Sequence, residues 1–556
     1  MIEPEAKKLF PRMIWLVILG GALTLMYQFW ELPVRDLLGN EGLFAALASE
    51  INLSKPMSMA HGVAIRNQYF LYPWLCAAVQ KHTGADMISI LRFVNLFFVV
   101  CTAILIAAAA GRTRNFKAGI VGASMFCANG YVFMHTLMAG PLMMSLFFLF
   151  AAQLCWIYFG FTKGRWNMAW LSGLFLVSLG FLAGGIKIPF YFFLPLLFLH
   201  RPLKLAPKLN KKGFIFGMII LGLFFLLWAS PFMLHARDYT WDYIPHNYRG
   251  MSNFLLNILL TPLYLLLLFL PWPLIMWMPF CSAIRPLDKT PIFSHYFRVL
   301  FTANLLAILF NPFSIMDDFM FVIPPLALLC ALSYDTAVRR YSVEMRRLVT
   351  LCGYITAALA AGLVIYCFCP YENLIKYVNF LPLDKGKDLI FSAILFFLIL
   401  SVWIYHYRKN GQLWMIMLLT GCALGIFAQL TFIPAYNSNR SRSNLGRAVF
   451  NAIKTDGGKE DAIICKNGIL DLYNEGYYMQ KKIRKLNALA DIDRKEPVIY
   501  LLTTDFPQYP DRTWKNLFET TYRGRKLILY RGDIAKRKEL INRRSLLREN
   551  NSGEEK

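Results

Sequence analysis

Apolar stretches of about 18 to 22 residues, almost free of charged side chains, recur along this chain. Their length matches the hydrocarbon core of a bilayer, which is about 30 Å thick. The pattern predicts about 13 transmembrane helices. We place them at residues 13–30, 90–110, 118–135, 140–160, 168–183, 187–200, 214–234, 254–280, 297–311, 318–334, 348–369, 388–407 and 413–434. The expected fold is therefore a polytopic, all-α membrane protein.

The pattern changes in a long loop after the first predicted span, at residues 31–89. Two segments of this loop, residues 40–50 and 69–80, carry apolar side chains at helical spacing. They predict two amphipathic helices that lie at the membrane interface. Because long ordered loops are usually functional, this loop is a candidate for the protein's chemistry.

Two further positions combine charge with the ends of predicted spans. In the loop at residues 235–253, His246 and Arg249 lie three residues apart among tyrosines. They could form a phosphate clamp, because arginine offers a planar fork of donors, or they could be ordinary interfacial residues. Asp317 and Asp318 stand at the mouth of the tenth span, either as a solvated helix start or as a metal or substrate site.

The tail from about residue 436 is charged throughout and contains three β-rich runs, at residues 461–466, 497–506 and 526–532. Strand and helix patterns alternate, which predicts a small α/β domain. The tail has no glycine-rich phosphate loop and no metal-ligand spacing. We therefore divide the chain into a membrane domain at residues 1–435 and a C-terminal soluble domain at residues 436–556.

The formal net charge of +25 would suggest a nucleic-acid partner in a soluble protein. Here the basic residues gather in every second short loop, as the positive-inside rule requires of cytoplasmic loops. We therefore expect no nucleic-acid partner, a cytoplasmic N-terminus and a C-terminal domain on the opposite side. Most of the 11 cysteines lie inside predicted spans and are expected to be small apolar packers. Only Cys367 and Cys369, near the outer face, leave a pairing open.

Several segments match short motifs of a known family. GNEGLFA at residues 39–45 and QYFLYPW at 68–74 resemble motifs of that family's first outer loop. Further similarity lies in LAGGIKIP at 182–189, in residues 244–249, in LPW at 270–272 and in residues 321–324. On these motifs the chain resembles the GT-C glycosyltransferases that use polyprenyl-phosphate sugars. The similarity is greatest to the bacterial lipid A aminoarabinose transferases and more distant to the protein O-mannosyltransferases.

The resemblance implies a GT-C-like membrane fold with a small C-terminal α/β domain. It also implies a glycosyltransferase that moves a sugar from a polyprenyl-phosphate carrier to an acceptor, which is lipid A, another glycan or a protein. The expected place is the outer face of a bacterial inner membrane, with the C-terminal domain in the periplasm and membrane lipids as further partners. No cofactor is certain, and a divalent metal ion at Asp317 and Asp318 is left open.

The resemblance also implies roles for individual residues. Inverting transfer needs a carboxylate that takes the acceptor's proton. Glu41 matches the family's second acid, while Asn40 replaces the first, and Asp36 lies about one helical turn away as a helper. The candidates for binding the donor and its phosphate are Arg66, Gln68, Tyr69, Lys187, His246 and Arg249.

Two other functions stay open at this point. Asn40, Gln68 and Phe321 stand where the family has an acid, a lysine and a tyrosine, so the chain could be a catalytically degenerate homologue. Such a protein would bind the lipid carrier or assemble complexes without transferring sugar. A transporter is disfavoured, because the sequence shows no inverted repeat and no pair of glycine-broken spans in corresponding halves.

Overall fold

The computed structural model describes part of the chain. Its contacts divide the chain into two compact units, neither of them continuous in sequence. We call residues 1–35, 68–234 and 244–440 the helical unit, and residues 36–67, 235–243 and 441–556 the sheet unit. The described residues are 37, 40–51, 57–65, 69–127, 129–136, 138–200, 203–234, 241–242, 258–261, 269, 273–311, 316–351, 354, 358, 361, 443–457, 464–467, 472–481, 483–486, 498–504, 512–522 and 525–534.

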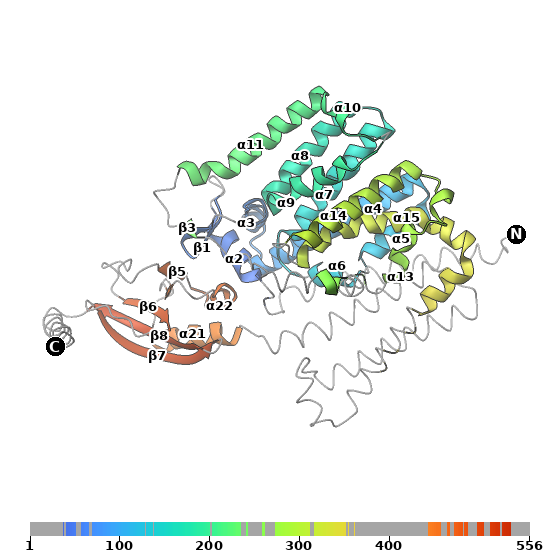
Figure 1. The fold of residues 1–556 in the computed structure, drawn as a ribbon. Coiled ribbons are helices and arrows are strands. Elements are labelled where there is room, and N and C mark those ends of the chain that lie inside the picture. The colour runs from blue at the N-terminus through green and yellow to red at the C-terminus, as the bar shows by residue number, and fades with distance from the viewer. Residues whose placement is uncertain are drawn as a thin grey trace, which may run out of the picture. The chain divides into compact units, whose positions relative to one another are not determined.

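In the part that the structure describes, the helical unit consists of helices (Figure 1). Its longer elements are α3 (Leu71–Thr83), α4 (Met87–Thr113), α5 (Phe116–Cys127), α6 (Gly130–Thr136), α7 (Leu142–Ile157), α8 (Trp166–Gly184), α9 (Lys187–Leu197), α11 (Lys212–Leu234), α14 (Pro291–Phe310) and α15 (Ile323–Arg340). Its short elements are the π-turn η1 (Tyr158–Thr162), α10 (Ala206–Leu209), α13 (Pro273–Met276), η2 (Met278–Phe280), η3 (Arg285–Leu287) and η4 (Met316–Val322).

Most of the predicted spans that fall on described residues are confirmed. Within the described part, 6 helices are long and apolar enough to cross a membrane: Met87–Thr113, Leu142–Thr162, Trp166–Gly184, Lys212–Leu234, Pro291–Phe310 and Asp317–Arg340. Each coincides with a predicted span. The spans at 13–30, 388–407 and 413–434, and most of those at 254–280 and 348–369, lie outside the described residues.

Two predicted spans differ from the structure. The span at 118–135 is divided into α5 and α6, because Asn129 starts a new helix: its Oδ1 accepts hydrogen bonds from the backbone N–H groups of Tyr131 and Val132 at 3.0 and 3.1 Å. The span at 187–200 is only the 11-residue helix α9. At about 1.5 Å per residue, α9 is too short to cross a bilayer alone.

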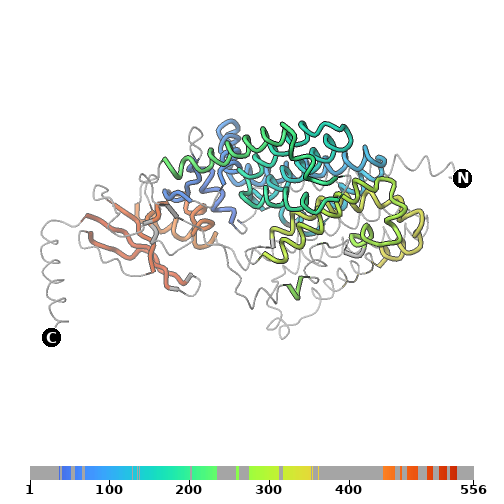
Figure 2. Tube along the Cα trace, turned by 45° about the horizontal axis from the view of Figure 1, so that its top comes forward, coloured from blue at the N-terminus to red at the C-terminus, as the bar shows by residue number. Residues whose placement is uncertain are grey.

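Among the described helices that could cross a membrane, the stretch Asp317–Arg340, which comprises η4 and α15, is the most buried, with 89% of its most apolar window inside the protein. It runs beside α14, as Figure 1 and Figure 2 both show. Its neighbour α5 approaches closely because Gly122 has no side chain there, and a Cβ would overlap Ile106 of α4 and Ala331 of α15. Small residues at helix contacts are the usual device for packing helices in membranes. This packing fixes the elements that hold Asp317 and Asp318.

The sheet unit contains a mixed five-stranded sheet with strand order β5-β4-β6-β8-β7 (Figure 1). Its strands are β4 (Ile464–Asn467), β5 (Ile483–Leu486), β6 (Val498–Thr503), β7 (Arg512–Tyr522) and β8 (Arg525–Ile534), and its helices are α21 (Ser443–Thr455) and α22 (Tyr473–Tyr478). β4 pairs in parallel with β5 and β6, while β8 pairs antiparallel with β6 and β7. The predicted small α/β domain is confirmed, as are strands in its three β-rich runs.

One face of this sheet forms a core with α21. Val449 and Ile453 of α21 are fully buried against Tyr500 and Leu502 of β6 and Leu529 of β8. The apolar positions of α21 recur at helical spacing, so one stripe of the helix covers the sheet. The alternate residues of β6, such as Ile499 and Leu501, are buried on the other face.

The remaining elements of the sheet unit come from the two predicted outer loops. The first loop supplies α2 (Glu41–Glu50), β1 (Met59–Ala60) and β2 (Val63–Ile65), and the second supplies β3 (Trp241–Asp242). β2 pairs antiparallel with β1 and in parallel with β3. Segments of both loops and of the tail thus belong to one compact unit.

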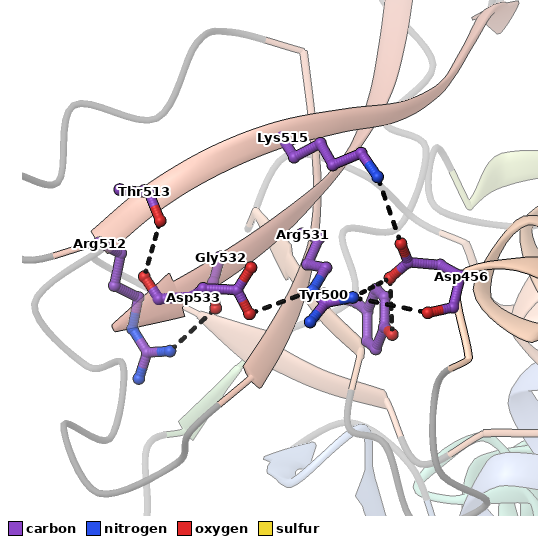
Figure 3. Close-up of polar contacts among 8 residues, drawn as sticks. All are labelled: Asp456, Tyr500, Arg512, Thr513, Lys515, Arg531, Gly532 and Asp533. Atoms are coloured by element: carbon purple, nitrogen blue, oxygen red, sulfur yellow. Dashed lines mark hydrogen bonds and ion pairs between the residues drawn. The ribbon is translucent and has the colours of Figure 1, made fainter. Parts of the chain in front are cut away.

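A polar cluster connects Asp456, which follows α21, with residues of β6, β7 and β8 (Figure 3). Arg531 lies between two carboxylates, with hydrogen bonds of 2.8 Å to Asp456 and 3.1 Å to Asp533. Asp456 also accepts from the Tyr500 hydroxyl at 3.2 Å and pairs with Lys515 at 3.7 Å. The charges of this cluster compensate one another, so we assign it a structural role.

From this cluster we predict that the folded sheet unit loses stability at alkaline pH. Burial, with a smaller contribution from Asp456, raises the pKa of Tyr500 above its ordinary value. A raised pKa means that the folded state holds this proton longer than the unfolded state, so stability falls as pH rises above about 10. At pH 8, Tyr500→Phe should be about 1 kcal/mol less stable than the wild type, because one hydrogen bond is missing. Between pH 9 and 11, its stability should fall less than that of the wild type, because phenylalanine has no proton to lose. The rate at which subtilisin cleaves the purified protein within residues 443–534 reports the stability of this region. If that rate depends on pH equally in the wild type and in Tyr500→Phe, the prediction is wrong.

Candidate functional site

An ion pair lies where α9 begins in the helical unit. The Lys187 ammonium donates to Asp318 Oδ1 at 2.8 Å. Asp318, in η4, is buried with 2% of its side chain exposed, whereas 34% of the Lys187 side chain is exposed. An ammonium group has three donors, so Lys187 can bind a further anion while it stays paired with Asp318.

The neighbouring carboxylate, Asp317, has different partners. Its Oδ1 accepts from the Tyr131 hydroxyl at 3.0 Å and lies 3.5 Å from His135 Nε2. Both partners come from α6, whose C-terminal end is fixed by the buried Asn95 of α4, because Asn95 Nδ2 donates to the carbonyl oxygen of His135 at 2.7 Å. Asp317 is 47% exposed. The predicted acidic pair is therefore divided into a buried, lysine-bound carboxylate and an accessible one oriented by α6.

Tyr69 is the first-loop candidate that the structure places near Lys187. Its ring stacks on Trp228 of α11 with ring centroids 5.6 Å apart, and it meets the edge of Phe181 at 5.7 Å. The ring also covers Gly185, two residues before Lys187, where a Cβ would overlap the Tyr69 ring. Gly185 has φ of +81°. Tyr69 thus lies against the glycine turn after which α9 begins with Lys187.

Replacing that glycine should have a large structural effect. Gly185→Ala adds a Cβ at a backbone conformation that L-residues rarely adopt and pushes it into the Tyr69 ring. We expect a loss of at least about 1 to 3 kcal/mol of stability. Thermal unfolding of the detergent-solubilised protein measures it. Gly164→Ala is the matched control, since Gly164 also has positive φ, at 66°, but a Cβ there meets nothing within 4 Å. Equal effects of the two changes would show that the Tyr69 contact is unimportant.

The candidate catalytic carboxylate lies in the sheet unit, on the first turn of α2. Glu41 is fully buried, while Asn40, which precedes α2, is exposed. α2 packs against α22 of the C-terminal segment. The helices predicted at residues 40–50 and 69–80 are confirmed as α2 and α3, whereas their amphipathic character stays a prediction. Their predicted position at the membrane interface stays a prediction.

The remaining predicted site residues lie outside the described residues: Asp36, Arg66, Gln68, His246 and Arg249. The same holds for Cys367 and Cys369. Among the described residues, no group of three His, Cys, Asp or Glu side chains is arranged to hold a metal ion. A metal role for Asp317 and Asp318 therefore stays a prediction, without support from the described geometry.

Sequence reasoning missed the α6 residues Tyr131 and His135, because both fell inside a predicted span. A signal was available in the sequence: Asn129 and Gly130 interrupt that span, and Asn is a preferred helix N-cap. It also missed Asn474 and Glu475, which are buried polar residues of α22. No local pattern marks Asn474, since its partner Gly42 lies in the first loop.

Comparison with known proteins identifies the fold. No family model matches this sequence, and no curated protein matches it. Among solved structures, the chain is similar to ArnT from Cupriavidus metallidurans in the apo state, with a TM-score of 0.69 and 13% identity, over 93% of this chain and 98% of that one. ArnT from the same organism bound to undecaprenyl phosphate gives a TM-score of 0.66 at 13% identity, over 92% of this chain and 97% of that one. The predicted GT-C-like membrane fold is thus confirmed.

Proposed function

We propose that this chain, which has the fold of ArnT, is a membrane glycosyltransferase that takes its sugar from a polyprenyl-phosphate carrier. The observation that carries the proposal is the extent of the structural similarity, which covers 93% of the chain. A match of that extent takes in the helical unit as well as the sheet unit. A similar structure also contains bound undecaprenyl phosphate, a carrier of the proposed class.

In the proposed reaction the acceptor hydroxyl attacks the anomeric carbon of the carrier-bound sugar. A glycosidic C–O bond forms, the C–O bond to the carrier phosphate breaks, and the phosphate leaves with the electron pair of that bond. The acceptor's proton passes to a carboxylate. Cations that bind the phosphate stabilise the negative charge that develops on it.

Lys187 is the described residue best suited to bind the phosphate. Its side chain is partly exposed, and its ammonium group has further donors besides the one that binds Asp318. Arg66 and Arg249, with Gln68, Tyr69 and His246, complete the donor site in this proposal. Arginine would bind two phosphate oxygens at once through its planar fork.

Glu41 is the proposed base, with Asp36 as a helper. Its place on the first turn of α2 suits an anionic side chain, because the helix dipole stabilises negative charge there. Glu41 is fully buried, so an acceptor reaches it only when the groups that cover it move. Transfer would then depend on that opening as well as on the chemistry.

We place the reaction at the outer face of a bacterial inner membrane, with a cytoplasmic N-terminus and a periplasmic sheet unit. The distribution of basic loops supports this orientation. The assembly of both outer loops and the tail in one unit supports a common side for them. The acceptor is lipid A, another glycan or a protein.

Mass spectrometry of lipid and glycan fractions from cells with and without the protein tests this function. We expect one glycan or lipid species to lack a single sugar in the deletion strain, and a polyprenyl-phosphate sugar to accumulate. The mass difference would give the class of the sugar, such as a hexose, a pentose or an amino sugar. If neither species changes, the protein is not the proposed transferase.

A second function is favoured by one observation on α2. The exposed position is occupied by an amide, Asn40, whereas the acid Glu41 is buried. This arrangement suits a homologue that binds the lipid carrier, or assembles a complex, without transfer. Such a protein would bind polyprenyl phosphate but would release none from a sugar-loaded donor.

A further inference from the structure

The first turn of α2 is capped by a residue that is far away in the sequence. The first N–H groups of a helix have no partner within the helix, and the residue just before it usually supplies an acceptor. Asn40 occupies that position but makes no capping hydrogen bond through its side chain. Instead, Asn474 Oδ1 accepts from the backbone N–H of Gly42 at 2.7 Å, in a buried contact between residues 432 positions apart.

The backbone of α2 also fits closely against the start of α22 at this point. A Cβ on Gly42 would overlap the carbonyl oxygen of Tyr473 and the backbone of Asn474. The cap is therefore possible only because residue 42 is glycine. Asn474 is 2% exposed, so water does not compete for its amide.

Other contacts attach the flanks of α2 to the same C-terminal segment. Before the helix, the Leu37 N–H donates to the Tyr478 hydroxyl at 3.0 Å. At its last residue, the Glu50 carboxylate accepts from the N–H groups of His61 and Gly62 at 2.6 and 2.8 Å. The His61 carbonyl oxygen in turn accepts from the Lys485 N–H at 2.9 Å. α2 is thus held at both ends, and Asn474 holds the end that carries Glu41.

We infer that Asn474 is a positioning residue, which fixes the first turn of α2 and with it the carboxylate of Glu41. The inference rests on the proposed function for the role of Glu41. It gives the C-terminal domain, which has no chemistry of its own in the sequence, a task in the reaction. Small displacements of a reacting group lower catalytic rates strongly, so losing this cap should lower kcat about ten- to a hundredfold. Donor binding should stay the same, because the residues proposed for it belong to other segments.

The test compares Asn474→Ala and Tyr478→Phe with the wild-type full-length protein. Asn451→Ala is the matched control, since Asn451 is an exposed asparagine on α21 in the same domain. Three quantities are measured: hydrogen exchange of residues 41–50, the affinity for undecaprenyl phosphate, and kcat and KM for release of the carrier from a sugar-loaded donor.

We expect Asn474→Ala to speed exchange in the first turn of α2 and to lower kcat, with KM and carrier affinity within about twofold of wild type. Tyr478→Phe should show the same pattern more weakly, and Asn451→Ala should match wild type. Unchanged exchange in Asn474→Ala would refute the cap. Faster exchange with unchanged kcat would refute the positioning role. An inactive wild-type protein would refute the proposed function instead, while the exchange measurement would still decide on the cap.

Discussion

Glu41→Gln should abolish sugar transfer, lowering kcat by about a hundred- to ten-thousandfold, because an amide cannot accept the acceptor's proton. The change keeps the size of the side chain, so α2 should still pack against α22. Affinity for undecaprenyl phosphate and the hydrogen exchange of residues 41–50 should therefore stay close to wild type. Steady-state release of free carrier from a sugar-loaded donor measures the effect.

Asp317→Asn is the informative comparison for Glu41→Gln. Asp317 is the more accessible carboxylate, and Tyr131 and His135 orient it. Under our proposal this variant keeps most of the activity. If Asp317→Asn is inactive and Glu41→Gln is active, the base has been assigned to the wrong carboxylate.

Lys187→Met should affect donor binding and stability together. Removing the ammonium leaves the buried Asp318 carboxylate without its lysine, which we expect to cost about 1 to 3 kcal/mol of unfolding free energy. The affinity for undecaprenyl phosphate should fall about ten- to a hundredfold, because a cation that binds the phosphate is lost. Binding titrations and thermal unfolding of the purified protein give the two quantities.

The double variant Lys187→Met/Asp318→Asn separates these effects. Removing both charges also takes away the buried negative charge of Asp318, so much of the stability lost in Lys187→Met should return. Carrier affinity should stay low, because the cation is still missing. Recovery of affinity along with stability would show that Lys187 acts only as a structural partner of Asp318.

The membrane helices could be predicted from the sequence because hydropathy is a local property. A run of apolar residues long enough to cross a bilayer has few alternatives to a transmembrane helix, and α4, α8 and α11 follow their predicted spans closely. Helix breaks inside such runs are harder to predict. The break before α6 depends on a single asparagine, Asn129, whose side chain competes for the backbone donors.

In the tail, prediction worked for buried strands and failed for polar ones. β6 and β8 contain runs of large apolar residues and were predicted. β7, with sequence RTWKNLFETTY, pairs with β8 alone and consists mostly of polar residues in no regular alternation, so its composition resembles a loop. β5, with sequence IRKL, is short and carries two charges.

The assembly of the sheet unit could not be predicted from the sequence, because its contacts are non-local. β2 pairs with β3 from a loop far along the chain, and Asn474 caps a helix 432 residues before it. Nothing in the local sequence around Asn474 indicates that partner. For the same reason, the sequence supplied Glu41 and Lys187 as candidates but did not supply Asn474, Tyr131 or His135.

The most direct test of the central claim is whether the purified protein releases free polyprenyl phosphate. The donor is a lipid extract from cells that lack the protein, in which the sugar-loaded carrier should accumulate, and total membrane lipid and glycan serve as acceptors. We predict that the wild-type protein releases the carrier in step with sugar transfer and that Glu41→Gln releases none. A wild-type protein that binds undecaprenyl phosphate but releases no more carrier than Glu41→Gln would contradict the account and favour a carrier-binding role.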